Sequence, residues 1–450
     1  MIEYRNVRVA LLGGGTVGAQ VARLLLEHKD ELAARVGATL ELTGIAVRNL
    51  DSPRSVDLPK ELFTTDAESL ILGADIVIEV MGGIEPARTY ILQALNSGAD
   101  VVTANKALLA NHGTVLFDAA ERVGAQLYFE AAVAGAIPII RPLRESLAGD
   151  RIKRVMGIVN GTTNYILDKM DVEGASFDDA LAVATELGYA EADPTADVDG
   201  FDAAQKVSIL ASLAFHTTIP LENVYREGIR SVTRQTVELA RKAGYVVKLL
   251  AICERLTDPV TGEEGVSARV YPALISRDHP LAAVHKANNA VFVEAEAAGS
   301  LMFYGAGAGG PETASAVMGD LVSAARRHVI GGPGLGSSTH ANLQVLPVSH
   351  ITTRYHVTLS VFDRPGVLAS VAQVFTEHGV SVELVEQGGF GIAGVAGVAG
   401  AAASEQPAPT ATLVIGTHAA LESDLAATVS ALAQLDAVSS VVSVLRIEGA

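Results

Sequence analysis

The sequence predicts an α/β chain with three parts: a doubly wound parallel sheet, an α+β domain, and a C-terminal unit with the ferredoxin-like order βαββαβ. Three observations lead to this prediction. The 450 residues are too many for one ordinary domain. Apolar strand-length runs alternate with amphipathic helical runs in the first third of the chain, which is typical of a parallel sheet covered by helices. The last hundred residues repeat a strand-helix-strand order twice.

The first part, residues 1–135, is predicted to be a Rossmann-type domain. An amphipathic helix follows its first strand, and another is expected at 89–98. Its strands are expected at 7–12, 40–47, 74–83, 100–106 and 125–133.

A glycine-rich turn stands between the first strand and the first helix. Residues 13–18, GGGTVG, satisfy G-x-G-x-x-G in the strand-turn-helix context that the motif needs. Gly13, Gly15 and Gly18 would let the backbone approach a pyrophosphate, whose charge would lie at the helix N-terminus. The motif therefore predicts a dinucleotide site, and a purely structural turn is the alternative.

The end of the second strand bears on which dinucleotide would bind. Arg48 stands where an NAD-binding chain more often carries an acid for the ribose 2′-hydroxyl, and Arg54 follows it. Two arginines suit a 2′-phosphate, which favours NADP over NAD. Asp51, which lies nearby, keeps NAD open.

The remaining chain divides into a second domain, a linker and a third domain. Residues 136–335 contain helical runs at 177–188, 201–215 and 237–252, followed by short alternating runs around 266–303. Residues 336–350 belong to a Gly, Ser and Pro-rich stretch that is typical of a linker. In 351–450, residues 389–409 are almost all Ala, Gly, Pro and Val, which predicts a long mobile loop. The third domain's strands are expected at 355–362, 380–387, 410–418 and 441–449, and its helices at 367–379 and 421–435.

Composition excludes several classes of protein. With 33 Lys+Arg against 51 Asp+Glu the formal charge is −18, which argues against a nucleic-acid partner. The single cysteine, Cys253, permits neither an internal disulfide nor a multi-thiolate metal site. The N-terminus does not resemble a signal peptide, and no uninterrupted apolar stretch is long enough to cross a membrane. We therefore expect a cytoplasmic protein without a membrane partner.

Two segments carry polar residues suited to chemistry. Thr103 and Lys106 end a predicted strand at the carboxyl edge of the sheet, where they could contact cofactor or substrate. Asp202 and Lys206 are one helical turn apart in an acidic stretch. Hydride transfer to a carbonyl places negative charge on the oxygen; a nearby ammonium can stabilise that charge and donate a proton, and carboxylates beside it would hold a cationic amine. An exposed salt bridge is the structural alternative; scattered histidines support neither zinc nor a Ser-His-Asp triad.

Five motifs together resemble the homoserine dehydrogenase family, from the first strand to the C-terminus. The resemblance implies NAD(P)H-dependent interconversion of L-aspartate 4-semialdehyde and L-homoserine, a step toward threonine, methionine and isoleucine. The motifs are GGGTVG (13–18), TANKALL (103–109), NGTTNYIL (160–167), LGYAEADPTADVDGFDAAQK (187–206) and YGAGAGGPETASAVMGD (304–320).

The same resemblance implies roles for individual residues. Lys206 would be the general acid and base, assisted by Lys106, while Glu191 and Asp202 would bind homoserine. Residues 304–330 would return to the cofactor domain. Cofactor contacts would come from Thr16, Val17, Gly188, Gly307 and the neighbouring Gly305. A monovalent cation, Na⁺ or K⁺, would be bound through Glu130, Val133, Gly135 and Ile137.

The C-terminal part resembles an ACT domain, a ligand-sensing module. Residues 363–368, DRPGVL, match its usual strand-to-helix turn, and the resemblance implies threonine as a feedback effector. Because ACT modules pair, we expect a homodimer or homotetramer. Two alternatives remain: a dehydrogenase of another amino-acid semialdehyde, and a catalytically silent amino-acid sensor. The sensor is disfavoured because Lys106, Glu191, Asp202 and Lys206 are all present.

Overall fold

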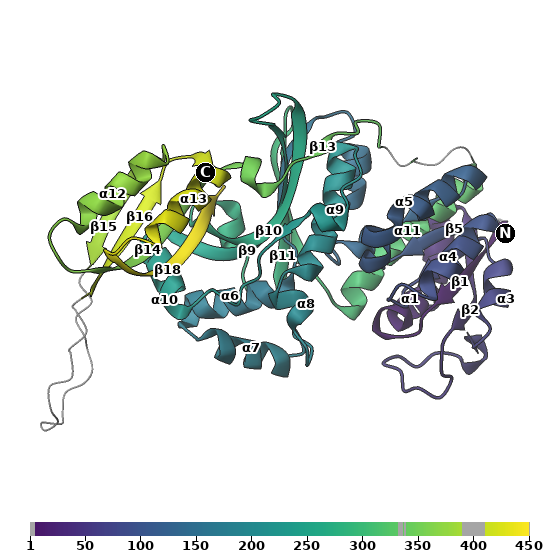
Figure 1. The fold of residues 1–450 in the computed structure, drawn as a ribbon. Helices are drawn as coiled ribbons and strands as arrows, with labels where there is room; N and C mark the ends of the chain where they lie inside the picture. Colours follow the sequence, from purple (N-terminus) through teal and green to yellow (C-terminus); the bar gives the residue numbers. More distant parts are fainter. Residues whose placement is uncertain (1–4, 332–335, 337–338, 389–409, 450) are drawn as a thin grey trace, which may run out of the picture.

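A computed structural model describes residues 5–331, 336, 339–388 and 410–449. Three regions follow one another across the molecule in Figure 1, with the N-terminal sheet at one side and the C-terminal unit at the other. Within the described residues, no helix combines the length and apolar character needed to cross a membrane.

The N-terminal region is a six-stranded sheet with the strand order β3-β2-β1-β4-β5-β6, and all of its pairings are parallel. This arrangement confirms the predicted doubly wound sheet. Its strands are β1 (Arg5–Leu12), β2 (Ala38–Ala46), β3 (Phe63–Thr64), β4 (Ile76–Glu79), β5 (Asp100–Thr103) and β6 (Leu127–Tyr128). Its helices are α1 (Thr16–Glu27), α2 (Lys29–Val36), α3 (Ala67–Leu72), α4 (Ala87–Asn96) and α5 (Lys106–Val123).

The strand expected at 125–133 is much shorter than predicted. It pairs only at Leu127 and Tyr128, and the chain then turns into a 3₁₀ segment, η2 (Glu130–Ala132). The main-chain N–H of Glu130 donates to the carboxylate of Asp320 at 2.7 Å, so this donor leaves the sheet. The expected strand is therefore wrong beyond residue 128.

One late helix belongs to the N-terminal core. Helix α11 (Gly310–Ile330) buries Ala314, Val317 and Leu321 in the same apolar cluster as Val9 and Leu11 of β1. In Figure 1 this green helix lies among the purple and blue elements of the first domain. The chain thus returns to its first domain after building the second.

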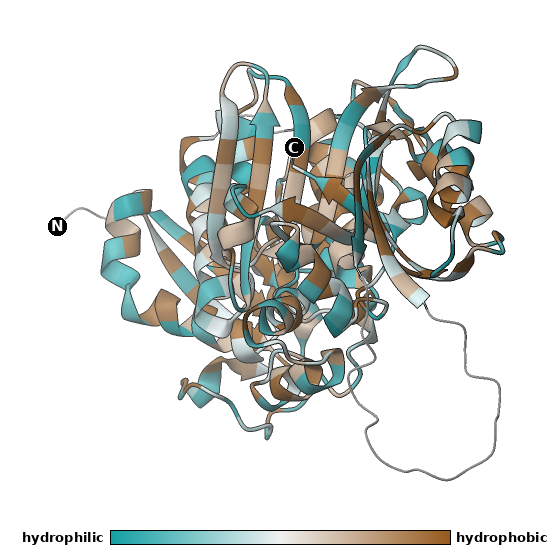
Figure 2. Ribbon diagram, turned by 90° about the vertical axis from the view of Figure 1, so that its left-hand side faces the viewer, coloured by the Kyte–Doolittle hydropathy of each residue, from teal (hydrophilic) through white to brown (hydrophobic). Residues whose placement is uncertain are grey.

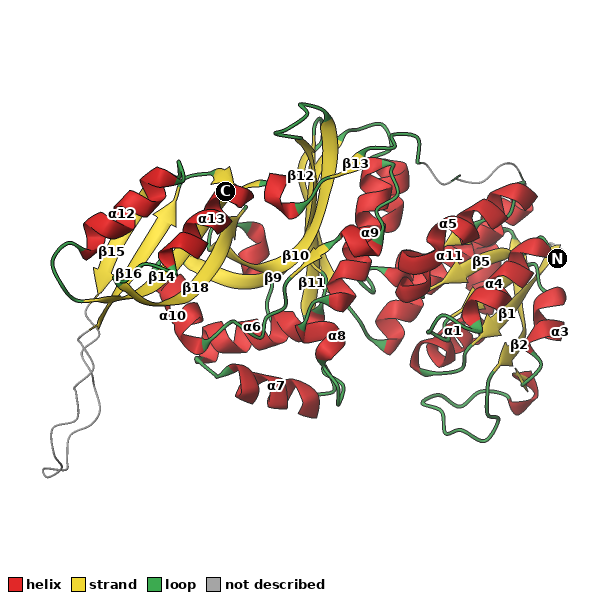
Figure 3. Cartoon of the chain, viewed as in Figure 1, coloured by secondary structure: helices red, strands yellow, loops and turns green. Residues whose placement is uncertain are grey.

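The middle region contributes five long strands and most of the remaining helices. Figure 3 shows its strands crossing the centre of the molecule beside α9. The strands are β7 (Ile152–Ile158), β9 (Tyr245–Thr257), β10 (Glu264–Ser276), β11 (Asn288–Ala295) and β12 (Gly299–Ala306). The helices are α6 (Gly161–Glu173), α7 (Phe177–Glu186), α8 (Thr195–Val198), α9 (Phe201–Phe215) and α10 (Arg234–Lys242). Single-turn segments of this region are η3 (Pro142–Ser146), η4 (Leu221–Asn223) and η5 (Pro280–Ala283), while η1 (Lys60–Leu62) lies in the first domain and η6 (Val348–His350) precedes β14.

The helix expected at 237–252 is wrong in its second half. Helix α10 ends at Lys242, Gly244 adopts a φ of +83°, and β9 begins at Tyr245. The run Val246–Cys253 is buried on both faces of the strand, so it lacks the alternation that identifies a half-exposed strand. A run that is apolar except for Lys248 is ambiguous between a helix and a central strand.

The C-terminal region has the predicted ferredoxin-like order. Its four long strands form the order β18-β14-β16-β15, and both helices lie between strands in sequence. The elements are β14 (Thr352–Phe362), α12 (Val367–Glu377), β15 (Val382–Gly388), β16 (Thr410–Thr417), β17 (Ala420–Leu421), α13 (Glu422–Leu432) and β18 (Val438–Glu448). The loop expected at 389–409 lies outside the described residues.

One edge of β10 joins the middle and C-terminal regions into a single sheet. Three segments pair with this edge in succession: β13 (Gln344–Val345), β8 (Tyr225–Arg226) and β18. Pairing with β18 matches Ala273 to Arg446 and Ile275 to Glu448. The expected linker therefore contains a strand, and its Leu346 N–H donates to the Val266 carbonyl at 2.7 Å. Figure 2 shows helices with both teal and brown segments around the strands, as expected for amphipathic helices on a sheet.

A lysine is buried in the middle of this sheet. Lys248 of β9 has no exposed surface, and its ammonium donates to the Asn164 side-chain oxygen at 3.0 Å and the Val284 carbonyl at 2.6 Å. Burial lowers the pKa of Lys248 to about 8, although Asp168 and Asp171 oppose this shift. Both partners are neutral oxygens, so charge on this amine is costly in the folded state.

Replacement of Lys248 by methionine should remove a pH dependence of stability. In wild type the unfolded chain keeps its proton to about pH 10.5 while the folded chain releases it near 8, so this group makes stability rise with pH between those values. The unfolding free energy of wild type minus that of Lys248→Met should therefore rise by up to about 3 kcal/mol as the pH increases over that range. Urea unfolding at several pH values measures it, with the exposed Lys242→Met as control; a constant difference would contradict the assigned cause.

Candidate active site

A cleft of about 710 Å³ lies between the first domain and the middle domain. Its walls come from the turn after β4, the start of α5, the start of α6, the loop after α7, the start of α9 and the segment before α11. Polar lining residues are Asn105, Lys106, Asn160, Thr162, Tyr189, Glu191, Asp197, Asp202, Lys206 and Thr313. Segments far apart in sequence thus converge on one space.

The glycine turn is built for close backbone packing at the start of α1. Gly13 has a φ of +107°, and a Cβ on it would lie 2.9 Å from the Val80 carbonyl oxygen. A Cβ on Gly18 would lie 2.0 Å from the Gly13 carbonyl oxygen, so only glycine fits there. Gly15 precedes α1 and no side chain caps that helix, which leaves its first N–H groups available to an anionic group.

The two arginines near the turn differ in their contacts. Arg48 is exposed just after β2. Arg54 lies against the turn: one guanidinium nitrogen donates to the Gly14 carbonyl at 3.3 Å, and the group stacks 4.0 Å from the centre of the Phe63 ring. Arg54 is therefore held in place beside the turn, while the Arg48 side chain is exposed.

Asp202 connects the two lysines that the sequence singled out. Its carboxylate lies 2.9 Å from the Lys106 ammonium through one oxygen and 2.7 Å from the Lys206 ammonium through the other. Lys206 also donates to the Val159 carbonyl at 2.6 Å. An ammonium has three N–H donors, so one remains on Lys206 to face the cleft.

Charges within this cluster stabilise one another. Burial alone would raise the pKa of Asp202, but the ammonium groups of Lys206 and Lys106 outweigh it and hold that pKa well below its usual range. The pKa of Lys106 is raised because Asp202, with Asp197 and Glu191 further away, outweighs the effect of burial. Asp202 thus remains ionised at neutral pH, between two cations.

Two polar residues of the cleft were not identified as site residues from sequence. The Asn160 side-chain amide donates to the Asp197 carboxylate at 2.7 Å and to the Asp202 carboxylate at 3.0 Å. Burial raises the pKa of Asp197, against the hydrogen bond from Asn160. Asn160 opens the NGTTN run and caps α6 by accepting from the Thr163 N–H, and that capping signal was available in the sequence.

Thr103 does not line the cleft, but it hydrogen-bonds to a residue that positions part of the cleft wall. It is fully buried, and its hydroxyl donates to the Glu79 carboxylate at 2.7 Å. Glu79 also accepts the main-chain N–H groups of Met81 and Gly82, which line the cleft. Asn105 caps α5 through the Leu108 N–H, so this network fixes the start of the helix that presents Lys106.

The remaining predicted cofactor and substrate residues lie around the rim. Val17, Gly188, Glu191 and Gly307 line the cleft, and Glu191 is exposed. Gly305 pairs within β12, outside the lining residues. Thr16 begins α1, and a Cβ on Gly310 would lie 3.0 Å from its methyl carbon, so α11 starts directly beside α1.

The segment expected to bind a cation uses its glutamate differently. Both oxygens of the buried Glu130 carboxylate are occupied, accepting the main-chain N–H groups of Ile139, Ile140 and Arg141 and the Arg141 guanidinium at 2.6 to 3.2 Å. In the residues that the structure describes, no hydrogen bond reaches the carbonyl oxygens of Val133, Gly135 and Ile137. Free oxygens for a cation here are therefore main-chain carbonyls rather than this carboxylate.

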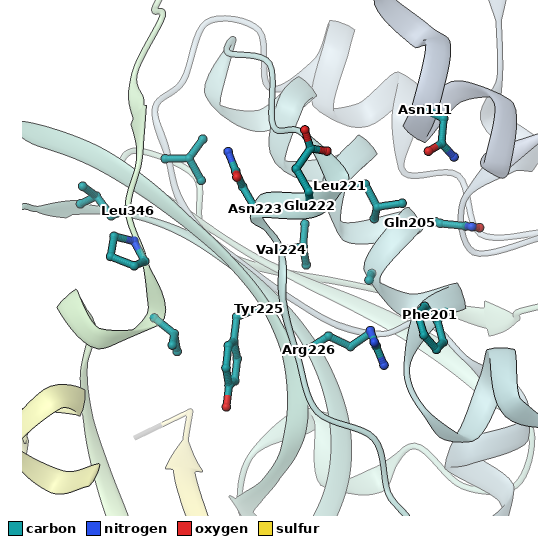
Figure 4. A pocket seen from close by; sticks show the side chains of 14 residues that line it. Asn111, Phe201, Gln205, Leu221, Glu222, Asn223, Val224, Tyr225, Arg226 and Leu346 are labelled. Carbon is teal, nitrogen blue, oxygen red and sulfur yellow. The ribbon is translucent and has the colours of Figure 1, made fainter. Parts of the chain in front are cut away.

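A second hollow of about 840 Å³ borders α9 at Phe201, Ala204 and Gln205, and Lys206 is not among its lining residues (Figure 4). Phe201 and Gln205 of α9, the segment 221–226 and residues 345–348 surround it. The Arg226 guanidinium, which lines this hollow, lies 3.5 Å from the centre of the Phe201 ring and donates to the Asp199 carbonyl. It contains none of the lysines, so the chemistry belongs to the first cleft.

A dinucleotide turn that faces lysines and a carboxylate across one cleft defines an NAD(P)-dependent oxidoreductase acting on a CH–OH group, and the comparisons agree. Family models match for the homoserine dehydrogenase NAD-binding domain at 13–130, homoserine dehydrogenase at 138–322 and the ACT domain at 355–437. The chain belongs to the homoserine dehydrogenase family, and it acts as a homoserine dehydrogenase.

Full-length relatives carry this assignment. The homoserine dehydrogenase of Corynebacterium glutamicum is 54% identical over 444 residues, which are 98% of this chain and 96% of that protein. That of Bacillus subtilis is 40% identical over 99% of both chains. A solved homoserine dehydrogenase from Thiobacillus denitrificans superposes with a TM-score of 0.88 at 38% identity, covering 99% of each chain. A hyperthermophilic archaeal homoserine dehydrogenase, solved in complex with NADPH, has a TM-score of 0.59 at 30% identity and covers 73% of this chain and 99% of its own.

Proposed function

We propose that this chain interconverts L-aspartate 4-semialdehyde and L-homoserine with NADP(H), as a step of threonine, methionine and isoleucine biosynthesis. The observation that carries the proposal is the bridge of Asp202 between Lys106 and Lys206 in the cleft next to the glycine turn. A reaction that turns an aldehyde into an alcohol needs a proton donor at the oxygen, and this cluster supplies one.

Lys206 donates the proton in this mechanism. The reduced nicotinamide, when bound, supplies a hydride to the carbonyl carbon. As that C–H bond forms, the carbonyl electrons move to the oxygen, which takes a proton from the Lys206 ammonium; in the reverse direction the neutral amine accepts it. Lys106 adds a second positive charge beside the developing alkoxide. Asp202 and Glu191 attract the ammonium of homoserine.

The cofactor preference rests on the arginines near the glycine turn. The uncapped N-terminus of α1 fits the pyrophosphate. Arg54, held against the turn, and Arg48, exposed at the end of β2, favour a ribose 2′-phosphate. The further contacts assigned to the cofactor are Gly13, Gly15, Thr16, Val17, Gly18, Gly188 and Gly307. Gly305 and Thr103 would act through their strand positions in β12 and β5.

A monovalent cation suits the segment after Glu130. Ala134 and Gly135 both have positive φ, 58° and 57°, which turns the chain sharply between the carbonyls of Val133 and Ile137. Neutral carbonyl oxygens without hydrogen bonds are ligands for Na⁺ or K⁺. The cation would hold the segment that lines the cleft at Ala134 and Gly135, through the carbonyls of Val133, Gly135 and Ile137. Glu130 would position this segment through its carboxylate, which accepts the N–H groups of Ile139 and Ile140.

Regulation and assembly complete the proposal. The ACT domain supports an amino-acid effector, for which we propose threonine.

The long sheet ends in two edge strands with exposed apolar side chains, which supports a homodimer or homotetramer. These side chains are Met302 and Tyr304 on β12 and Leu384 and Val385 on β15. The lone buried Cys253 fits a reducing cytoplasm.

One assay series tests the proposal. At low cofactor concentration, the purified chain should oxidise L-homoserine faster with NADP⁺ than with NAD⁺. The rate should fall when Na⁺ and K⁺ are replaced by tetramethylammonium, and it should also fall when threonine is added at millimolar concentration. Arg54→Ala should narrow the preference for NADP⁺. A faster reaction with a different amino alcohol than with homoserine would contradict the proposed substrate pair, and a threonine-insensitive rate would contradict the proposed effector.

A further inference from the structure

The loop of residues 227–230, which follows β8, contacts the turn between α8 and α9 directly. The Ile229 N–H donates to the Val198 carbonyl at 2.8 Å, and the Arg230 guanidinium lies 2.6 Å from the Asp199 carboxylate. A Cβ on Gly228 would lie 2.4 Å from the same Val198 carbonyl oxygen, so the two backbones are in direct contact. The loop thus sets the position of residues 198–200.

That turn carries two carboxylates of the cleft. Asp197 belongs to α8 and lines the cleft. Gly200, with a φ of +78°, leads into α9, on which Asp202 lies in the first turn. Any shift of the turn would therefore move Asp197 and Asp202 relative to Lys106, which stands on the other domain.

The same loop is held from its other side by the ACT domain. The Arg446 guanidinium of β18 lies 2.9 Å from the Glu227 carboxylate and 2.6 Å from the Glu422 carboxylate at the start of α13. Arg446 is 7% exposed, and the centres of the Tyr271, Tyr225 and Tyr355 rings lie 4.5 to 5.7 Å from its guanidinium carbon.

A buried guanidinium remains charged, and its nitrogens are shared here between two carboxylates: two donate to Glu422 and the third donates to Glu227. Tyr225 donates its hydroxyl to Glu227, while the neighbouring Arg226 points toward Phe201 in Figure 4. Glu227 therefore lies between the ACT domain and the rest of the loop that contacts the turn between α8 and α9.

We propose that Glu227 is a positioning residue for the substrate-binding carboxylates and that Arg446 of the ACT domain holds it in place. The inference rests on the role proposed above for Asp202. It makes the ACT domain part of the homoserine site even without an effector: β18 and α13 hold Glu227, the loop holds the α8–α9 turn, and the turn places Asp197 and Asp202.

Glu227→Lys tests this, because it places a second cation against Arg446. We expect the KM for homoserine to rise about tenfold, which corresponds to about 1.4 kcal/mol, while kcat and the KM for NADP⁺ change less than about twofold. Glu227→Gln, which keeps a hydrogen-bonding oxygen, should raise the homoserine KM about threefold. Glu383→Lys is the matched control, since Glu383 pairs with Arg354 at 3.6 Å on the ACT surface, away from the loop.

A double variant separates positioning from general damage. Glu227→Lys combined with Arg446→Met removes the clash of cations and should recover part of the homoserine KM. The proposal is overturned if Glu227→Lys and Glu227→Gln both keep the wild-type homoserine KM, or if the KM values of both substrates rise together. Wild type that does not oxidise homoserine would instead refute the proposed function; active wild type with an insensitive Glu227 would refute only this inference.

Discussion

Lys206→Ala is expected to lower kcat about 10²- to 10⁴-fold in both directions of the reaction. The variant loses the ammonium that donates to both Asp202 and the Val159 carbonyl and that has a further N–H for the reacting oxygen. Binding of the cofactor should be nearly unchanged, because the glycine turn lies on the other domain. Steady-state kinetics with homoserine and NADP⁺, together with a fluorescence titration of NADPH, measure both quantities.

Lys206→Arg sharpens the test. Arginine keeps the positive charge next to Asp202 but does not release a proton in the accessible pH range, so it should not restore kcat. Lys242→Ala, on the exposed end of α10, controls for the loss of a lysine. Near-normal kcat in Lys206→Ala would assign the proton donor to another group, with Lys106 as the next candidate.

Asp202→Asn is expected to lower kcat/KM for homoserine about 10³-fold, an effect of roughly 4 kcal/mol on transition-state stabilisation. Two ammonium groups would then lie close together without the carboxylate that separates them, and the substrate ammonium would meet a positive cleft. The KM for NADP⁺ should change little. Kinetics at varied homoserine and at varied NADP⁺ distinguish the two effects.

The same variant should alter stability with a defined sign. Because the folded state holds the pKa of Asp202 below its usual value, its ionisation stabilises the folded protein at neutral pH, and that contribution is lost as pH falls below about 4. Asp202→Asn should therefore be less stable than wild type at pH 7, by about 3 kcal/mol, with a smaller difference in acid. Asp193→Asn, an exposed carboxylate of the same acidic stretch, is the control; equal losses in the two variants would contradict the assignment.

The chemistry of the site was largely readable in the sequence because it resides in local patterns. The strand, the glycine turn and the helix of residues 7–27 are contiguous, and the spacing from Asp202 to Lys206 places both on one helix face. Contacts between distant segments were not readable. Lys106 meets Asp202 only because two domains close on one cleft, and Asn160 reaches Asp197 only because α6 and α8 start side by side.

Two parts of the fold were beyond local patterns for a different reason. In 245–252 a mostly apolar run, interrupted by Lys248, does not distinguish a helix from a strand buried on both faces, and Gly244 was the local signal of the break. The edge of β10 accepts β13, β8 and β18 through main-chain groups that every residue carries. Side-chain identity says little about which edge a strand will join, so a linker was expected where a strand is found.

Pairing of β18 with β10 also bears on how the chain folds during synthesis. Translation proceeds from the N-terminus, so β10 leaves the ribosome well before the final strand of the protein exists. Until Arg446–Glu448 arrive, the main-chain N–H and C=O groups of Ala273–Ile275 have no strand beside them on that edge. Nascent chains halted before residue 438 should therefore have an unpaired edge on β10, which could bind chaperones or lead to aggregation. Only β18, the last strand to be synthesised, pairs with residues 273–275 at this edge.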